Sequence, residues 1–249
     1  MPAVLDSYFK YHELTQCQQL QTALLSTHRS DFGKYSPKTN HQYLQSAFEK
    51  APAFVGQPVK YVKIDRDIRS RDLKLAIDLL ERANLLYPVY ATAASGLPLG
   101  ALINHKKFKI IFLDIGLVNR LTRIDIETLL KEKMLLINQG ALAEQFVGQE
   151  LLAYSNWDEE GQVYFWSREK QGSSAEVDFV TAAGSVIVPI EVKAGATGKL
   201  KSLRLFMEEK HSKIGVRICQ QALMYNQNIL SVPFYLISEL DRLIMDCLS

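Results

Sequence analysis

A short stretch in the C-terminal half of the chain has the pattern of a β-hairpin whose strands carry charged residues. Two runs rich in β-branched residues, 177–181 and 186–192, flank the small residues 183–185. Such runs around a glycine-containing turn predict two antiparallel strands. Asp178 lies in the first run and Glu191 in the second, so both carboxylates are expected on a sheet and not in a loop. A charge fixed in a sheet needs a compensating partner, which restricts how this part of the chain can fold.

Alternation along the two strands predicts that the charges converge. Glu191 and Lys193 are two residues apart, so they are expected on one face, whereas Ile190 points to the other. On the first strand, Asp178 shares a face with Glu176. If the charged faces of the two strands coincide, two carboxylates and an ammonium group meet on one patch of sheet.

This combination of residues has a catalytic interpretation and a structural one. Two adjacent carboxylates suit a hard divalent ion such as Mg²⁺ or Mn²⁺, which keeps waters and substrate phosphate oxygens in its other positions. Lys193 would then stabilise negative charge on a phosphate under attack. Alternatively, the stretch is an ordinary surface hairpin in which Glu191 and Lys193 simply pair, because short charge motifs arise often by chance.

A third carboxylate is predicted on a helix that covers residues 134–153. At 100° per residue, Glu144 lies on an apolar face with small residues such as Gly148, while Gln145 lies elsewhere around the helix. A carboxylate that faces packed structure usually has a hydrogen-bond partner or a metal there. The alternative is that Glu144 lies at the helix edge and extends to water.

A helix carboxylate, a strand Asp and a strand Glu-x-Lys in this order resemble the PD-(D/E)XK nuclease-like superfamily, also called restriction-endonuclease-like. The surrounding sequence, over nearly the whole chain, is similar to the C-terminal region, a domain of unknown function, of a family of prokaryotic AAA-type ATPases. The segments that carry this second resemblance are K-Y-S-P-K at 34–38, S-R-D-L-K-L-A-I-D-L-L-E-R-A-N-L-L-Y at 70–87, F-K-I-I-F-L-D-I-G-L at 108–117, G-A-L-A-E-Q-F-V-G-Q-E-L at 140–151, V-Y-F-W-S at 163–167, A-E-V-D-F at 175–179, P-I-E-V-K-A-G at 189–195 and K-S-L-R-L-F at 201–206.

The resemblance implies a fold class, a metal site and a partner. The fold would be α+β or α/β: a helical, winged-helix-like domain at 1–120, then a restriction-endonuclease-like mixed sheet flanked by helices at 121–249. Asp178, Glu191 and Glu144 would hold Mg²⁺ or Mn²⁺ and, together with the catalytic lysine Lys193, form the catalytic set. An ATPase module, in cis or in trans, is the expected partner.

An ATP site is not expected in this chain. A phosphate-binding loop needs the pattern G-x-x-x-x-G-K-[ST], which does not occur; the nearest segment, 195–200, ends in Leu. The chain therefore resembles the part of such proteins that follows the ATPase module. A fragment, a naturally short protein and a recombinant piece all fit this expectation.

The first half of the sequence predicts helices followed by a two-stranded ribbon, as in a winged helix. One helix is expected from a cap at Ser36 to about Lys50 and another from a cap at Ser70 to Ala83, and the strands are expected at 85–92 and 107–113. In such a fold the second helix would present basic residues to DNA and the ribbon would present two lysines. The candidate nucleic-acid contacts are Arg69, Arg71, Lys74, Lys106 and Lys107. Because acidic residues interrupt this helix face, contact with a protein partner is the alternative.

A second basic region lies next to the charged hairpin. Residues 191–217 hold seven Lys or Arg against three acidic residues, although the whole chain carries a net charge of only +2. Lys199, Lys201 and Arg204 are therefore candidate DNA contacts beside the site. A solvated helix face is the alternative for such a charge run.

Bulk properties favour a cytoplasmic protein. No run of apolar residues is long enough to span a membrane, no signal peptide is present, and the three cysteines show no C-x-x-C pair. Two hypotheses follow. The first is Mg²⁺-dependent DNA binding or cleavage by phosphodiester hydrolysis. The second is a non-catalytic DNA- or protein-binding, regulatory module that docks to an ATPase domain. The sequence leaves the oligomeric state open.

Overall fold

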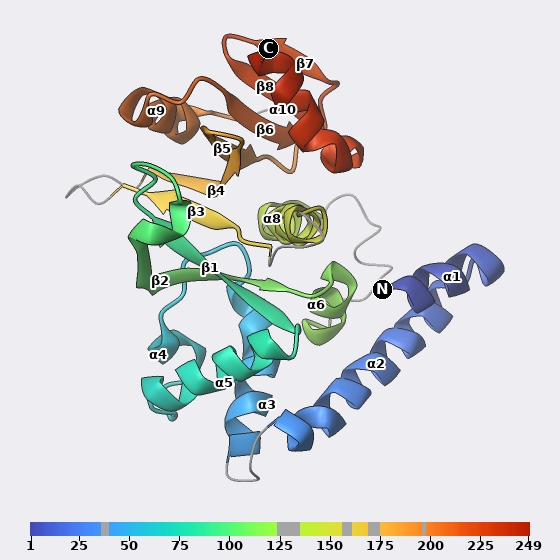
Figure 1. The fold of residues 1–249 in the computed structure, drawn as a ribbon. Helices are drawn as coiled ribbons and strands as arrows, with labels where there is room; N and C mark the ends of the chain where they lie inside the picture. Colours follow the sequence, from blue (N-terminus) through green and yellow to red (C-terminus); the bar gives the residue numbers. More distant parts are fainter. Residues whose placement is uncertain (36–39, 124–134, 156–160, 169–174, 196–197) are drawn as a thin grey trace. The chain divides into compact units, whose positions relative to one another are not determined.

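The computed structural model describes residues 1–35, 40–123, 135–155, 161–168, 175–195 and 198–249 (Figure 1). The chain divides into two compact units: unit 1 comprises residues 1–88 and 109–138, and unit 2 comprises residues 89–108 and 139–249. A single boundary near residue 120 was expected from the sequence. The segment 89–108 instead belongs to the C-terminal unit, because strand pairing joins it to that unit's sheet.

Unit 1 is mainly helical. Its helices are α1 (Pro2–Tyr11), α2 (Leu14–Tyr35), α3 (His41–Lys50), η2 (Ala51–Phe54), α4 (Tyr61–Ile64), α5 (Ser70–Arg82) and α6 (Ile115–Leu121). The spacing of Leu73, Ile77 and Leu80 in the sequence predicts one inward face for α5, and this is confirmed because all three are fully buried. The predicted cap at Ser36 lies outside the described residues.

The prediction that Ser70 caps α5 is wrong by one residue. Arg69 occupies the N-cap position with an extended backbone, and its carbonyl accepts hydrogen bonds from the N–H groups of Asp72 and Leu73. No side chain caps this helix end. Ser70 is therefore the first helical residue, where its hydroxyl cannot serve as the N-cap acceptor.

Aromatic packing forms the centre of unit 1. Phe48 of α3 contacts Phe32 of α2 at a ring-centroid distance of 5.6 Å and Phe112 at 6.0 Å. All three side chains are buried, and edge-to-face geometry of this kind adds to the stabilisation from burial. The aromatic residues thus hold two helices against the end of a strand.

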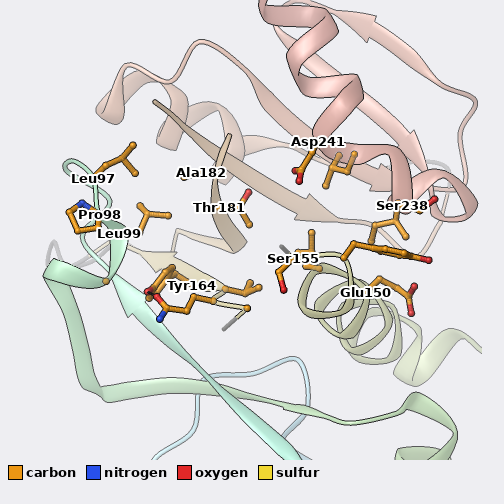
Figure 2. A pocket seen from close by; sticks show the side chains of 18 residues that line it. Leu97, Pro98, Leu99, Glu150, Ser155, Tyr164, Thr181, Ala182, Ser238 and Asp241 are labelled. Carbon is orange, nitrogen blue, oxygen red and sulfur yellow. Dashed lines mark hydrogen bonds between the residues drawn. The ribbon is translucent and has the colours of Figure 1, made fainter. Parts of the chain in front are cut away.

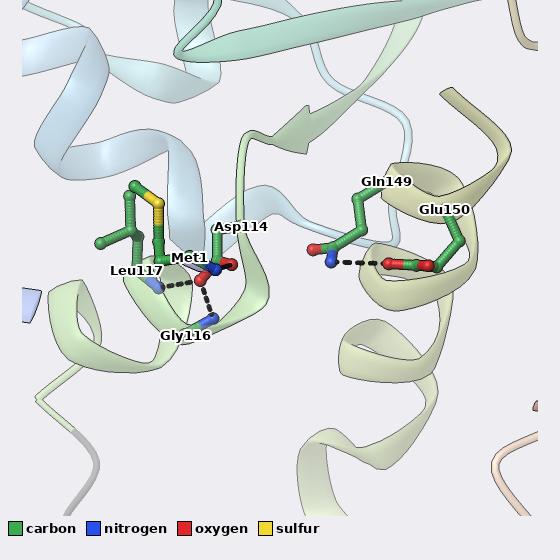
Figure 3. Close-up of polar contacts among 6 residues, drawn as sticks. All are labelled: Met1, Asp114, Gly116, Leu117, Gln149 and Glu150. Carbon is green, nitrogen blue, oxygen red and sulfur yellow. Dashed lines mark hydrogen bonds and ion pairs between the residues drawn. The ribbon is translucent and has the colours of Figure 1, made fainter. Parts of the chain in front are cut away.

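Asp114 fixes the start of α6. Its Oδ1 accepts hydrogen bonds from the N–H groups of Gly116 (2.8 Å) and Leu117 (3.2 Å), and its Oδ2 lies 2.6 Å from the ammonium group of Met1 (Figure 3). A carboxylate at this position satisfies backbone donors that have no partner within the helix. The α6 helix therefore begins directly after the strand that ends at Phe112.

Unit 2 is built on a mixed sheet. It contains residues 89–92 of β1 (Leu86–Thr92) and residues 103–108 of β2 (Ile103–Phe112). Its other elements are η3 (Leu99–Leu102), α8 (Leu135–Ala153), β3 (Tyr164–Ser167), β4 (Glu176–Ala183), β5 (Val186–Val192), α9 (Lys201–Lys210), β6 (Gly215–Cys219), β7 (Met224–Asn226), β8 (Ile229–Pro233), η4 (Phe234–Glu239) and α10 (Leu240–Leu248). Among the described residues, eight strands form one sheet in the order β2-β1-β3-β4-β5-β6-β8-β7. The architecture is therefore α+β with a mixed sheet.

Five strands of this sheet run in one direction. β1 pairs with β3 in parallel, β3, β4 and β5 form an antiparallel meander, and β5, β6 and β8 are parallel. The carboxyl ends of β1, β3, β5, β6 and β8 consequently lie along one edge of the sheet, together with the start of β4. We call this the carboxyl edge. In open sheets of this kind, ligands commonly bind outside the carboxyl ends of parallel strands.

The predicted hairpin is confirmed. β4 and β5 pair from Phe179–Ile190 to Ala183–Val186, and the turn between them contains Gly184 with a φ of 57°. Glycine adopts this left-handed conformation without steric cost, which explains the tight turn.

Helices pack against the sheet of unit 2, with α9 on one side and α8 and α10 on the other (Figure 1). Phe206 of α9 meets Trp166 of β3 edge to face at 5.3 Å. Gly215 of β6 is needed on this side, because a Cβ there would come within 2.6 Å of the Met207 sulfur. None of the helices in the described part of the chain is long and apolar enough to cross a membrane.

Asp65 gives unit 1 a pH-dependent contact. Its Oδ2 accepts hydrogen bonds from Lys50 Nζ (2.5 Å) and Ser46 Oγ (2.6 Å), and its Oδ1 accepts one from the Asp67 N–H. The hydrogen bonds from Lys50, Ser46 and Asp67, in that order, lower the pKa of Asp65 to about 2. A carboxylate with a depressed pKa stabilises the fold above its unfolded pKa, and this stabilisation disappears as the pH falls through the folded pKa.

We predict that Asp65→Asn destabilises the protein by about 1 kcal/mol at pH 7, a value that allows for the solvent screening of half-exposed Lys50. The difference from wild type should vanish as the pH falls from 4 to 2. Urea unfolding at several pH values measures this. A difference that stays constant down to pH 2 would contradict the assignment.

Candidate functional site

The predicted carboxylates Asp178 and Glu191 lie at the carboxyl edge of unit 2. Asp178 is near the start of β4, and Glu191 is near the end of β5, the neighbouring strand. Because the strands are antiparallel, these two ends meet at the same edge of the sheet. Lys193 follows β5 directly, so the three residues are assembled from a single hairpin and the residue after it.

A β-bulge directs the side chain of Asp178. Tyr164 of β3 pairs with Val180 and Trp166 pairs with Val177, so β4 has one more residue than β3 between these pairs. Asp178 lies in this bulge, and its Oδ2 accepts a hydrogen bond of 2.8 Å from the N–H of Val192. Bulges commonly re-aim side chains beside functional sites. The carboxylate of Asp178 is thereby fixed against the main chain next to Glu191.

Glu191 and Lys193 form a close ion pair. Lys193 Nζ lies 2.5 Å from Glu191 Oε1, and the side chains are 27% and 8% exposed, respectively. The N–H of Lys193 donates to the carbonyl of Ile218 on β6. Gly198 packs against the lysine stem, since a Cβ there would lie 2.7 Å from Lys193 Cδ. Backbone, stem and ammonium group of Lys193 are therefore all held in place.

Arg217 adds a second cation beside this pair. In the parallel register of β5 and β6, Arg217 is the partner of Glu191. Its Nη2 donates to Gln221 Oε1 and, at 2.9 Å, to Ser231 Oγ. Sequence reasoning counted Arg217 only as part of a basic region, because its position beside Glu191 follows from the strand register. The site thus contains two carboxylates and two cations.

Glu144 lies in the middle of α8 and is partly buried. Two sides of α8 are covered: Gly148, on the face predicted for Glu144, is buried, and Gln145, on another side of the helix, is only 1% exposed. Among the described residues, no three Asp, Glu, His or Cys side chains gather closely enough to hold a metal ion. The assignment of Glu144 to a metal site stays a prediction.

A basic cavity lies at the ends of β1 and β3 in unit 2. It has a volume of about 980 Å³, and Lys106, Arg168 and Lys210 line it. The predicted contact Lys107 lies close by and donates to Ser167 Oγ at 2.5 Å. Arg168 pairs with Glu209 of α9. Arg168 was not predicted from the sequence, because the pairing of β1 with β3 brings it to this cavity, and Lys210 of α9 was counted only as part of the basic region 191–217.

The other predicted basic contacts divide between the two units. In unit 2, Lys199 and Lys201 are exposed, and Arg204 is exposed and donates to Gln227 Oε1 at 3.0 Å. In unit 1, Arg69 is exposed, Arg71 Nε lies 3.7 Å from Asp72, and Lys74 pairs with Asp78 at 2.7 Å. The acids of α5 therefore balance two of its three candidate cations.

A further cavity of about 680 Å³ lies away from these charges in unit 2 (Figure 2). Thr181 near the end of β4, Tyr164 at the start of β3, Glu150 of α8 and Asp241 of α10 line it. Burial raises the pKa of Tyr164. Gly100 is required there, because a Cβ would lie 2.7 Å from the Tyr164 hydroxyl. This cavity is at the opposite end of β3 and β4 from Asp178.

Comparison with protein families gives two matches. Residues 1–128 match the model described as "Domain of unknown function (DUF8612)", which covers 128 of the 249 residues. The chain belongs to the DUF8612 family. Residues 139–236 match the model described as "Domain of unknown function (DUF4143)", and this DUF4143 region contains Asp178, Glu191 and Lys193. No curated protein and no solved structure matches the chain.

The Glu191–Lys193 pair predicts a measurable coupling energy. Glu191→Gln and Lys193→Met should each destabilise unit 2 by about 1–3 kcal/mol, because each leaves a buried or half-buried charge uncompensated. The double variant should also be destabilised, but by at least about 0.5 kcal/mol less than the sum of the destabilisations of the two single variants. Urea unfolding of the four proteins measures the coupling, with exposed Lys201→Met in place of Lys193→Met as the matched control. Additive losses would show that the pair contributes nothing.

Proposed function

We propose that unit 2 is a metal-dependent nuclease-like domain that hydrolyses phosphodiester bonds in DNA. The observation that carries this proposal is the placement of the Asp178 carboxylate beside the Glu191–Lys193 pair at the carboxyl edge of the sheet. Carboxylates and one lysine at a strand edge are the groups that phosphodiester hydrolysis requires: oxygen ligands for a hard ion and a cation for the phosphate.

The order of elements supports a restriction-endonuclease-like fold. A helix (α8), a three-stranded antiparallel meander (β3, β4 and β5), a second helix (α9) and a strand parallel to the meander's last strand (β6) follow one another. Within this series Glu144 lies on the helix α8, Asp178 on β4 and Glu191 on β5, which is the order of a helix carboxylate, a strand Asp and a strand Glu-x-Lys that carries the resemblance to PD-(D/E)XK nucleases. On the same resemblance, the helical unit 1 would be winged-helix-like, and the exposed residues Arg69 and Arg71 would be candidate DNA contacts.

The donor set suits magnesium or manganese with two protein ligands. Asp178 and Glu191 supply oxygen atoms from neighbouring strands, and Mg²⁺ in phosphate-processing sites is often held by only one or two carboxylates. These two residues would hold the ion, with Glu144 as a third candidate. When bound, such an ion stabilises negative charge on phosphate and lowers the pKa of coordinated water.

The protein's own residues have distinct roles in this proposal. The Val192 N–H orients Asp178, and the packing of Gly198 on the lysine stem orients Lys193. The ammonium group of Lys193 would exchange part of its contact with Glu191 for a phosphate oxygen of the substrate. The strongest argument for DNA is the basic cavity of Lys106, Arg168 and Lys210, which lies along the same carboxyl edge and can contact phosphates.

A cleavage assay tests the proposal. The purified chain should nick supercoiled plasmid or branched DNA in the presence of Mn²⁺ or Mg²⁺ but not in excess chelator. Lys193→Ala should reduce the rate about a hundredfold or more, because it removes a charge that acts on the phosphate. Circular dichroism should show that the variant remains folded.

The matched control is Lys213→Ala, which removes an exposed lysine from the loop after α9. It should cleave like the wild type when purified in the same way. A contaminating nuclease would cleave equally in both variant preparations, so a difference between Lys193→Ala and Lys213→Ala excludes one. Failure to cleave plasmid, branched or single-stranded DNA with either ion would overturn the proposal, as would equal cleavage by the Lys193→Ala variant.

A second candidate function rests on the charge balance of the same site. Two carboxylates lie with two cations, and Glu191 is already paired with Lys193 inside the protein. This arrangement also suits a non-catalytic module in which the charges stabilise the hairpin while the sheet edge docks DNA or a partner such as an ATPase module. In that case the chain binds its partner, does not bind added Mn²⁺ and does not cleave DNA.

A further inference from the structure

Three arginines line a cleft in unit 1, and none of them is among the residues predicted from the sequence to contact DNA or a metal. It lies between α2, the end of α3 and the end of α6 and has a volume of about 510 Å³. Thr22, Arg29, Glu49, Arg120 and Arg123 supply its polar lining. We call this set the arginine cleft.

The arginine cleft has more positive than negative charge. Its described lining contains three guanidinium groups and one carboxylate. Arg29 Nε lies 3.3 Å from Glu49 Oε1, and the same oxygen accepts a hydrogen bond from Gln45. Glu49 therefore neutralises Arg29 only in part. Like charges held close together are costly unless an anion balances them.

The hydrogen bonding of two arginines leaves donors available. Arg120 Nε donates to Thr22 Oγ1 at 2.8 Å, which fixes the guanidinium plane on the wall of the cleft. Arg29 Nε is shielded from solvent and lies 3.3 Å from Glu49 Oε1, but within the described part of the chain it makes no contact with the geometry of a hydrogen bond. A buried donor whose hydrogen bond is not made often marks the place of a water or an ion.

The end of α6 brings Arg123 to the cleft. Arg123 follows the C-cap residue of α6 with a φ of 56°, the left-handed conformation with which helices commonly end, as α1 and α9 do at His12 and His211. Attraction of Arg120 and Arg123 to the negative end of α6 accounts for part of their placement, but it does not require Arg29 of another helix.

We propose that the arginine cleft binds a phosphate dianion. Guanidinium groups match phosphate oxygens with paired N–H donors, and three of them at one cleft can supply several donors to one phosphate. The cleft is large enough for a small phosphorylated anion and equally admits the terminal phosphate of a longer molecule. The inference concerns unit 1 alone and does not depend on the proposed function of unit 2.

Calorimetric titration of the full chain with inorganic pyrophosphate, at constant ionic strength in chloride, tests the proposal. Wild type should show saturable binding. Arg120→Gln combined with Arg123→Gln should weaken binding at least about tenfold, since two charge-assisted contacts are lost. Arg66→Gln removes an exposed arginine from the same unit and is the matched control, which should bind like the wild type.

A second pair of titrations distinguishes the source of the phosphate. The first titration compares an oligonucleotide that has a 5′-phosphate with its unphosphorylated form. If the phosphorylated form binds more tightly to the wild type, and this difference disappears in the double variant, the cleft binds a terminal phosphate. Binding of pyrophosphate alone identifies a free anion. If the double variant fails to fold, Arg123→Lys replaces it, because lysine keeps the charge but loses the paired donors and should weaken binding several-fold. Absence of saturable pyrophosphate binding to wild type, or equal binding by the arginine variants and Arg66→Gln, would overturn the proposal.

Discussion

A carboxylate buried in a sheet must be matched by a nearby positive charge, and the edge of unit 2 is organised around this requirement at Glu191. The side chain is only 8% exposed and lies against Lys193, with Arg217 beside it on the next strand. The hairpin turn at Gly184 sets the register, and the bulge in β4 then brings Asp178 to the same edge. Loss of Lys193 would remove the ion-pair partner of this buried carboxylate, which explains why the lysine is held so closely to it.

The same requirement separates the two candidate functions. If Lys193 and Arg217 are the permanent partners of the carboxylates, the edge is a stable ion cluster and serves recognition. If a divalent ion shares the carboxylates, Lys193 is released toward a phosphate, and the edge becomes catalytic. The basic cavity at Lys106 and Arg168 suits either function, because it can hold a DNA backbone with or without cleavage.

Local features of the fold were predictable from the sequence, and features that depend on distant pairing were not. The β4–β5 hairpin and the buried face of α5 follow from periodicity over a few residues, so Gly184 and Leu73 were placed correctly. The bulge at Asp178 depends on the register with β3, and the division of the chain depends on the pairing of β1 with β3. Gln145, which the helix pattern placed away from the apolar face, is buried because packing around α8 decides which side is covered.

We propose that Asp178 and Glu191 form a site for a divalent cation at the carboxyl edge. Calorimetric titration of Mn²⁺ into the full chain, in the absence of nucleic acid, measures binding to this site. We expect saturable binding in the wild type that is lost in Asp178→Asn and in Glu191→Gln and is retained in Arg242→Gln, which changes an exposed residue of α10. If the folded wild type does not bind Mn²⁺, or if binding survives both carboxylate substitutions, these residues do not form a cation site.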